Sequence, residues 1–521
     1  MLIKLKKYIL KIVLIFLAIF IAVIIFNGIF FYEDYGNVLF TYNPIFLIIT
    51  VMGYCIFISL VYKYIIPKIE KSKLIVYILL ILFTVLCIFS GNYFKLNPSW
   101  DMGAVFSIAK DYVLDNKTEN LYLYTFPNNI MLVGIYQAIF SFFYMLKNTD
   151  FLTIATIFNS LLVAFTGILL YYNTNIIFGK RKALMILIIT IITVPLYLYS
   201  ACYYSDTISM FFTMLMVTVY LKTKNKDSKI IEQEQKINAK KIVLQILFGI
   251  ILFLGIKIKI TSIFIFIALI IYDILICKFN IKNILKEFKF SFMILILLYF
   301  LFNVFIEPLY IPDKQLLETN KIPTEHWIMM GLKGKGGFST DEYLYTQSFE
   351  TFQEKKEANR KVIKERIYDL FFNKTLFEHL KQKIIYGLCD GTYFSPEVLR
   401  REPVKYRILH EVVLSKGKNT QIYKYWPQSM HFGMLIFILI NVYKTLKDKE
   451  YNAKDNVLFI AVLGIMVFLL MWENRSRYLI TMLPIIMMSQ LGGIEYLAKK
   501  KGEKNEKNIS CYTNVLRRRS S

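Results

Sequence analysis

The sequence predicts an all-α polytopic membrane protein, and two observations lead to that prediction. Of the 521 residues 56% are hydrophobic, and the mean hydropathy is +0.49. Many apolar runs also reach the ~20 residues that a helix needs to cross a bilayer. A water-soluble protein could not bury this much apolar surface. We therefore expect one large helical membrane domain with one long polar loop, rather than several soluble domains.

The net charge of +25 does not indicate nucleic-acid binding. The basic residues lie mostly in short segments between apolar runs, which is the distribution that the positive-inside rule produces. We expect the lipid bilayer as a partner and no nucleic acid. The six cysteines form no CxxC or Cys/His cluster, so neither a disulfide framework nor a zinc signature is indicated.

The Lys/Arg asymmetry of the loops orients the spans. Four lysines among the first eleven residues place the N-terminus in the cytoplasm. The loops 222–241 and 277–289 and the tail from Lys499 are also basic, with seven, four and eight basic residues against three, one and two acids. All of them lie inside only if the apolar stretch 128–147 does not cross. We therefore predict that 128–147 is a re-entrant or interfacial helix.

Twelve crossings follow, with a margin of one or two, both termini in the cytoplasm, and a cell-membrane location. The predicted spans are about 9–30, 44–65, 74–92, 152–172, 183–201, 207–221, 242–256, 259–276, 290–307, 429–446, 457–472 and 478–496.

The spans divide the chain into five parts, of which one is a sizeable polar region on the outer side. That region, 308–428, is too long for a linker and predicts an extracytoplasmic subdomain, with a helical pattern from about 348 to 385. The parts are an N-terminal hairpin (1–73), a transmembrane module (74–307), the loop subdomain (308–428), C-terminal transmembrane helices (429–498) and a basic cytoplasmic tail (499–521).

Polar residues gather at three turns on the predicted outer face. They are Trp100-Asp101, the segment 203–206 and the segment 473–478, and a weaker fourth turn spans 257–261. An ionisable group at the centre of a membrane helix costs about 2.5–3.5 kcal/mol, and less near the interface. Ordinary residues at helix ends would need no function. Two acids and an arginine pair at one depth favour the functional interpretation.

Such a set of groups suits transfer of a sugar from a lipid-linked phosphate. A carboxylate accepts the proton of the attacking hydroxyl, and cations hold the phosphate as charge develops on it. A phosphate leaves as a weak base, so no general acid is needed. The lipid tail of the donor keeps the site at membrane depth.

Five short motifs in chain order carry a resemblance to a known family. They are Trp100-Asp-Met-Gly103, Phe126-Pro-Asn-Asn129, Phe178-Gly-Lys-Arg-Lys182, Tyr204-Ser-Asp206 and Lys259-Ile-Thr261. With them the chain resembles the GT-C superfamily of polyprenyl-phosphate-dependent glycosyltransferases, in the branch of protein mannosyltransferases and aminoarabinose transferases (glycosyltransferase family 39-like) of Gram-positive type. The fourth motif is a shortened match, and the fifth lacks the family's proline. The resemblance covers about 74–310 and the late Arg-Tyr segment.

The resemblance implies a GT-C-like helical bundle and an inverting transfer, on the outer membrane face, from a polyprenyl-phosphate sugar to a glycan, lipid or protein acceptor of the cell envelope. It implies that Asp101 is the catalytic base and Asp206 the second acid. For substrate binding we expect Trp100, Tyr204, Lys259, Arg475 and Arg477, with Glu325 and His326 of the outer loop contacting the acceptor.

Two other classes of function compete with the enzyme. A flippase or transporter of lipid-linked sugars should show internal repeats and helices broken near the midplane, and neither is evident in the sequence. A non-catalytic scaffold of a polysaccharide assembly complex is the other alternative. No cofactor is assigned, because the four histidines are scattered, and a need for a divalent metal stays open.

Overall fold

The computed structural model describes residues 2–32, 41–116, 120–224, 239–276, 287–447 and 453–499. Within these ranges every regular element is a helix, and an isolated bridge joins Leu96 to Pro403. Most of the basic loops 222–241 and 277–289, and the tail after Lys499, lie outside the described residues.

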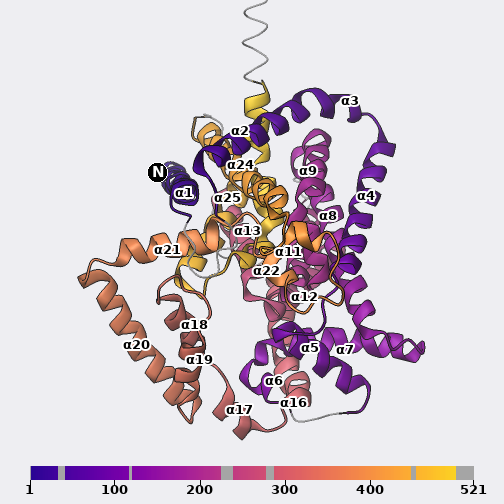
Figure 1. Cartoon of the computed structure of the whole chain (residues 1–521), viewed down its shortest axis with the longest axis vertical. Coiled ribbons are helices and arrows are strands. Elements are labelled where there is room, and N and C mark those ends of the chain that lie inside the picture. The colour runs from indigo at the N-terminus through magenta and orange to yellow at the C-terminus, as the bar shows by residue number, and fades with distance from the viewer. Residues whose placement is uncertain are drawn as a thin grey trace, which may run out of the picture.

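Long apolar helices form the body of the molecule (Figure 1). Within a bilayer such helices associate through close side-chain packing and interhelical hydrogen bonds rather than through the hydrophobic effect. These elements are α1 (Leu2–Phe30), α2 (Pro44–Leu60), η1 (Val61–Ile65), α3 (Ile66–Ile69), α4 (Lys73–Tyr93), α8 (Phe151–Phe178), α9 (Lys180–Ile192), α10 (Val194–Leu198), η3 (Tyr199–Ala201), α11 (Ser205–Lys224), α12 (Ala239–Ile258), η5 (Ile260–Ser262), α13 (Ile263–Ile276), α15 (Lys289–Leu301), η6 (Phe302–Ile306), α24 (Thr420–Lys447), α25 (Ala453–Met471), η7 (Ser476–Met482) and α26 (Leu483–Ser489).

Shorter and more polar helices surround one end of this bundle. They are α5 (Trp100–Val113), α6 (Leu121–Thr125), η2 (Pro127–Asn129), α7 (Ile130–Met145), α16 (Glu307–Tyr310), α17 (Lys314–Asn320), α18 (Thr324–Gly331), α19 (Thr340–Gln347), α20 (Phe352–Phe372), α21 (Leu376–Leu388), α22 (Ser395–Leu399) and α23 (His410–Val413). The predicted loop subdomain 308–428 is thus mostly helical. In it α18, α19 and α20 pack together, and α21 packs on α1 and α25.

A helix corresponds to each of the twelve predicted spans. Eight helices of the described residues are long and apolar enough to cross a membrane, or nine if α9 and the segment 194–201, bent by 62°, count as one broken span. The three remaining predicted spans are α11, α13 and α25. Of these, α13 and α25 are apolar but short. The all-helical polytopic fold predicted from hydropathy is therefore confirmed.

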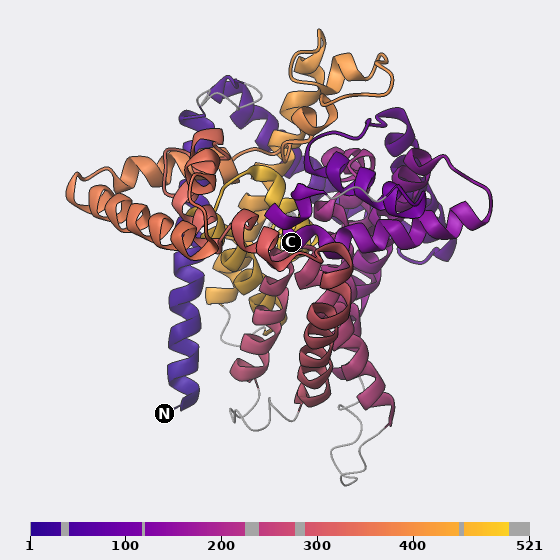
Figure 2. The same ribbon diagram turned by 90° about the horizontal axis from the view of Figure 1, so that it is seen from below.

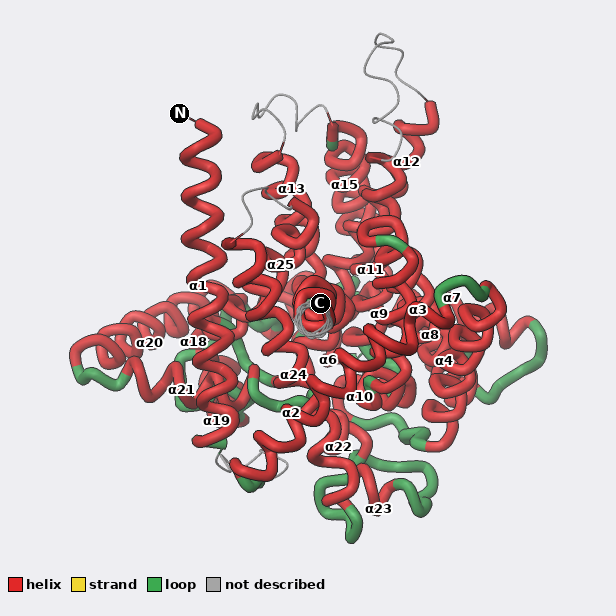
Figure 3. The backbone as a smooth tube through the Cα atoms, turned by 90° about the horizontal axis from the view of Figure 1, so that it is seen from above, coloured by secondary structure: helices red, strands yellow, loops and turns green. Residues whose placement is uncertain are grey.

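The stretch predicted to lie at the membrane surface is α7, which is not among the span candidates. Figure 2 shows α7 running across the direction of the upright helices such as α1 and α15. The first residues of α1, α12 and α15 lie at one end of the molecule (Figure 3).

The last span lies at the centre of the bundle. In Ser476–Lys499 89% of the most apolar window is buried inside the protein, against 6% in the peripheral span Lys289–Tyr310. The beginning of this span packs on α11, η5 and α21. Polar groups at its start are therefore surrounded by protein, which places the arginines of η7 in a sheltered position.

Candidate functional site

Four chain turns that are far apart in sequence meet at the start of the central span. They are the start of α5, the turn before α11, the turn between α12 and η5, and the segment between α25 and η7. The turns bring together seven of the nine residues that the sequence predicted for the site.

Asp206 and Lys259 form an ion pair at the base of this cluster. The Asp206 side chain is almost fully buried, and that of Lys259 is 14% exposed. Lys259 has extended backbone between the end of α12 and η5, and its ammonium group lies 4.6 Å from the centre of the Tyr478 ring. The second carboxylate oxygen of Asp206 is buried without a hydrogen-bond partner among the described residues. The ion pair thus holds both side chains in place, and it does not use the Oδ2 atom of Asp206.

Trp100 lies beside two guanidinium groups. The Cζ atoms of Arg401 and Arg477 are 5.2 Å and 5.0 Å from the centre of its indole ring. Tyr204 packs against the same ring edge-on, with the centroids 4.9 Å apart. Trp100 has a positive φ of 45°, a strained conformation for a bulky residue. Backbone strain of this kind persists only where contacts with the surrounding structure hold the residue in that conformation.

Asp101 occupies the first turn of α5, where a negative charge is favoured by the helix dipole. Its carboxylate is within hydrogen-bonding reach of the Tyr122 hydroxyl, and burial raises the pKa of that hydroxyl. The Tyr122 hydroxyl also accepts a hydrogen bond from Asn129 Nδ2 at 2.7 Å. Asn129 belongs to the Phe-Pro-Asn-Asn motif, so this predicted turn lies against the predicted base.

The segment 473–477, which leads from α25 into η7, contributes one acid and two arginines. Burial raises the pKa of Glu473, while the nearby Arg475 and Arg477 oppose that shift. The Arg475 guanidinium lies 4.6 Å from the centre of the Phe394 ring. The Nε atoms of both arginines are buried without a hydrogen-bond partner in the described part of the chain. A guanidinium group so placed has free donors to offer an anion.

Two polar residues that sequence reasoning missed hold this framework. Asn159 of α8 donates from Nδ2 to the carbonyls of Tyr199, Ser200 and Cys202 at 2.9–3.0 Å, which fixes the turn leading into Asp206. Asp390 accepts a hydrogen bond from Ser476, between the two arginines, at 2.7 Å. An asparagine inside a predicted apolar span was the available signal for Asn159.

Asp390 is fixed in turn by its own loop. Its carboxylate also accepts bonds from the backbone amides of Thr392 and Phe394, each at 2.9 Å. Phe394 has the left-handed φ of 64°, and its ring is the one beneath Arg475. The loop after α21 therefore packs against the segment that carries Arg475 and Arg477 and holds it in place. No short local motif in the sequence indicates this contact.

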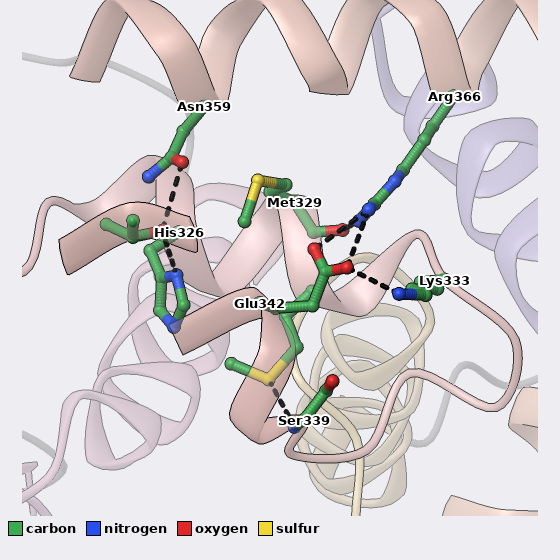
Figure 4. A network of polar contacts seen from close by, with 9 residues as sticks. His326, Met329, Lys333, Ser339, Glu342, Asn359 and Arg366 are labelled. Atoms are coloured by element: carbon green, nitrogen blue, oxygen red, sulfur yellow. Dashed lines mark hydrogen bonds and ion pairs between the residues drawn. The ribbon is translucent and has the colours of Figure 1, made fainter. Parts of the chain in front are cut away.

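Glu325 and His326 have other partners. Glu325 bonds Arg360 of α20 at 2.9 Å. His326 Nδ1 is 2.7 Å from Thr346 Oγ1, and burial lowers the pKa of His326 to about 4. Figure 4 shows His326 in a network of α18, α19 and α20, in which Glu342 binds Arg366 and Lys333. Glu325 and the Nδ1 atom of His326 thus join helices of the loop subdomain, while His326 Nε2 is buried without a hydrogen-bond partner among the described residues.

The described residues contain no group of three or more His, Cys, Asp or Glu side chains that could hold a metal ion. The side chains that the four turns bring together offer charged groups of both signs. These are carboxylates beside arginines and one lysine, enclosed by aromatic rings. The arrangement can bind an anion and accept a proton next to it.

The apolar helices and the polar cluster at their ends define an integral membrane protein. The chain belongs to the family described as conserved hypothetical integral membrane protein, whose model matches residues 2–495. No curated protein matches the sequence significantly.

Among solved structures the chain is similar to the oligosaccharyltransferase of Archaeoglobus fulgidus. The complex with Zn and sulfate matches with a TM-score of 0.38 and 13% identity, over 85% of this chain and 48% of that chain. The form tethered to an acceptor peptide gives 0.45 and 12%, over 83% and 50%. The complex with an inhibitory peptide and a dolichol-phosphate gives 0.40 and 12%, over 89% and 51%. The chain spans about half the length of these structures.

Proposed function

We propose that this protein is a membrane glycosyltransferase that moves a sugar from a polyprenyl-phosphate donor to an acceptor of the cell envelope on the outer membrane face. One observation carries the proposal. Asp101 lies in the same cluster as Arg475, Arg477 and the Asp206–Lys259 pair, although four separate turns supply them. The GT-C resemblance of the sequence motifs adds to it.

In this proposal the acceptor hydroxyl attacks the anomeric carbon of the donor. The new bond joins the acceptor oxygen to that carbon, and the bond from the carbon to the phosphate oxygen breaks. The proton passes to the Asp101 carboxylate, and the bonding electrons leave with the polyprenyl phosphate. Attack from the face opposite the phosphate inverts the anomeric centre. The free N–H groups of Arg475 and Arg477 stabilise the charge that develops on the phosphate.

The remaining groups hold this arrangement. Asp206 holds Lys259 in an ion pair beside Tyr478, so the ammonium group adds to the positive potential. Trp100 and Tyr204 form an apolar wall next to the base, suited to a sugar ring or the first unit of the lipid. The lipid tail of the donor would stay among the apolar spans.

The test is an assay of the purified full chain in nanodiscs with a panel of radiolabelled polyprenyl-phosphate sugars and envelope acceptors. Transfer from one donor, with inversion and loss in Asp101→Asn, is the expected result. Movement of the donor between leaflets without sugar transfer would indicate that the protein is a flippase and not an enzyme. Full transfer by Asp101→Asn would overturn the assignment of the base.

A further inference from the structure

A segment of the outer loop is joined by backbone hydrogen bonds to the extended segment that leads into the site. The amide of Asn97 donates to the carbonyl of Glu402 at 2.8 Å, and the amide of Val404 donates to the carbonyl of Lys95 at 2.9 Å. Leu96 and Pro403 form the antiparallel bridge between them. The segment 95–97 ends three residues before Trp100. Arg401 is therefore held at a fixed position next to the start of α5.

Arg401 uses its side chain at the site rather than at the surface. Its guanidinium contacts the Trp100 ring that Arg477 also contacts. Cation–π contacts of this kind contribute about 0.5–2 kcal/mol. Arg401 has no side-chain hydrogen bond or ion pair within the described ranges. The neighbouring acid Glu397 is bonded instead to Arg400 at 2.5 Å and to Ser415 at 2.8 Å.

Three guanidinium groups therefore share one region without acid partners within ion-pair distance in the described chain. Burial, together with the charges of Arg477 and Arg475, lowers the pKa of Arg401. The indole N–H of Trp100 and the Nε atoms of Arg475 and Arg477 are buried and unpartnered. Every one of these groups is a hydrogen-bond donor. A collection of buried donors and mutually repelling cations is stabilised when an anion enters it.

We infer that Arg401 is the third arginine of an anion-binding site with Arg475 and Arg477, and that the ligand is a lipid phosphate or diphosphate headgroup. The inference that this headgroup belongs to a sugar donor rests on the proposed function. Arg401 comes from the loop subdomain, whereas Arg477 lies in the first turn of the central span and Arg475 directly before it. The site is complete only when the segment 402–404 is paired with 95–97.

The test is calorimetric binding of three probes to the full chain in nanodiscs: farnesyl phosphate, farnesyl diphosphate and the neutral farnesol. The variant is Arg401→Gln, and the matched control is Arg400→Gln, which removes a neighbouring exposed arginine bonded to Glu397. We expect Arg401→Gln to weaken both phosphate probes by about tenfold or more, because a charge-assisted bond to phosphate is lost. Arg400→Gln should change them by less than about twofold, as for exposed pairs.

The preferred probe indicates whether the headgroup has one phosphate or two. Arg401→Lys keeps the charge but loses the planar fork, and should weaken binding less than Arg401→Gln. If Arg401→Gln does not fold, as judged by gel filtration, Arg401→Lys is measured in its place. An unchanged affinity of Arg401→Lys for the phosphate probes then overturns the inference. The inference also fails if both glutamine variants lose affinity equally, or if farnesol binds as tightly as the phosphates.

The outcomes separate this inference from the proposed function. Arginine-dependent phosphate binding without sugar transfer from any donor would leave Arg401 in its site and remove the glycosyltransferase. If the protein transfers sugar but Arg401→Gln binds the phosphate probes as tightly as the wild type, the glycosyltransferase assignment stands. In that case Arg401 is not part of the anion-binding site.

Discussion

The Asp206 carboxylate is ion-paired with the Lys259 ammonium group, although the two residues are 53 positions apart in the chain. The pair joins the beginning of α11 to the turn between α12 and η5. It lies where the arginines of η7 enter the same region, so its loss should affect both stability and the site.

We expect Asp206→Asn to destabilise the protein by about 3–5 kcal/mol, because Lys259 is left as an uncompensated buried charge. The double variant Asp206→Asn with Lys259→Met should recover most of that stability without recovering transfer. Thermal unfolding in detergent measures the first quantity, and the donor assay measures the second. A double variant as unstable as the single one would contradict the pairing argument.

Asp101→Asn should lower the transfer rate by about 10²–10⁴-fold while the protein folds and inserts normally, since general base catalysis typically contributes that much. The matched control is Asp111→Asn on the same helix, α5. That variant should keep its rate. Equal losses in both variants would indicate a general effect on α5 rather than a base.

Because Lys383 is buried, we expect the free energy of unfolding to rise with pH. Its side chain is fully buried in α21, where it donates to the carbonyls of Gly331 at 2.7 Å and Trp472 at 2.8 Å. Burial lowers the pKa of Lys383 from 10.5 to about 7. Between these two values the unfolded chain holds the proton and the folded chain has released it, so stability increases as pH rises through the window.

The check on Lys383 is the melting temperature in detergent from pH 6 to pH 10. The upward slope of the wild type should be smaller in Lys383→Met, which has no proton to lose. Because other groups titrate in the same range, the difference between the two curves is the measured quantity. Parallel curves for the two proteins would contradict the assignment of this pH dependence to Lys383.

Glu325 and Glu342 provide a contrast within the loop subdomain. Glu342 is buried and binds Arg366 through both oxygens, at 2.9 and 2.8 Å. Glu342→Gln should therefore loosen α19 and α20 and speed their proteolysis, because a buried cation loses its partner. Glu325→Gln removes a contact to the exposed Arg360 and should have little effect on proteolysis. A large rise in acceptor KM for Glu325→Gln would restore the predicted contact with the acceptor.

Asn159→Leu should reduce transfer more than it reduces stability. The leucine fills the space, but three carbonyls of the turn before Asp206 lose their shared donor, and Thr207 loses the acceptor Asn159 Oδ1. The turn then no longer holds Asp206 in one place. An unchanged rate would mean that the backbone alone fixes this turn.

The membrane fold and the residue types of the site could be predicted from the sequence. Hydropathy is a local property, so runs of apolar residues indicate helices such as α1 and α8 without knowledge of their neighbours. The cost of charge near hydrocarbon singled out Asp101, Asp206 and the arginines of η7. The asymmetry of basic loops similarly separated α7 from the crossing helices.

The sequence by itself determined that this chain is a helical membrane protein with acids and cations at its turns. Only the tertiary structure decided which of these groups meet: Asp206 with Lys259, Arg401 with Trp100, and Glu325 with Arg360 rather than with the site. Each of these contacts joins segments distant in the chain. Which turn faces which depends on how whole helices pack, and neither hydropathy nor a short motif contains that information.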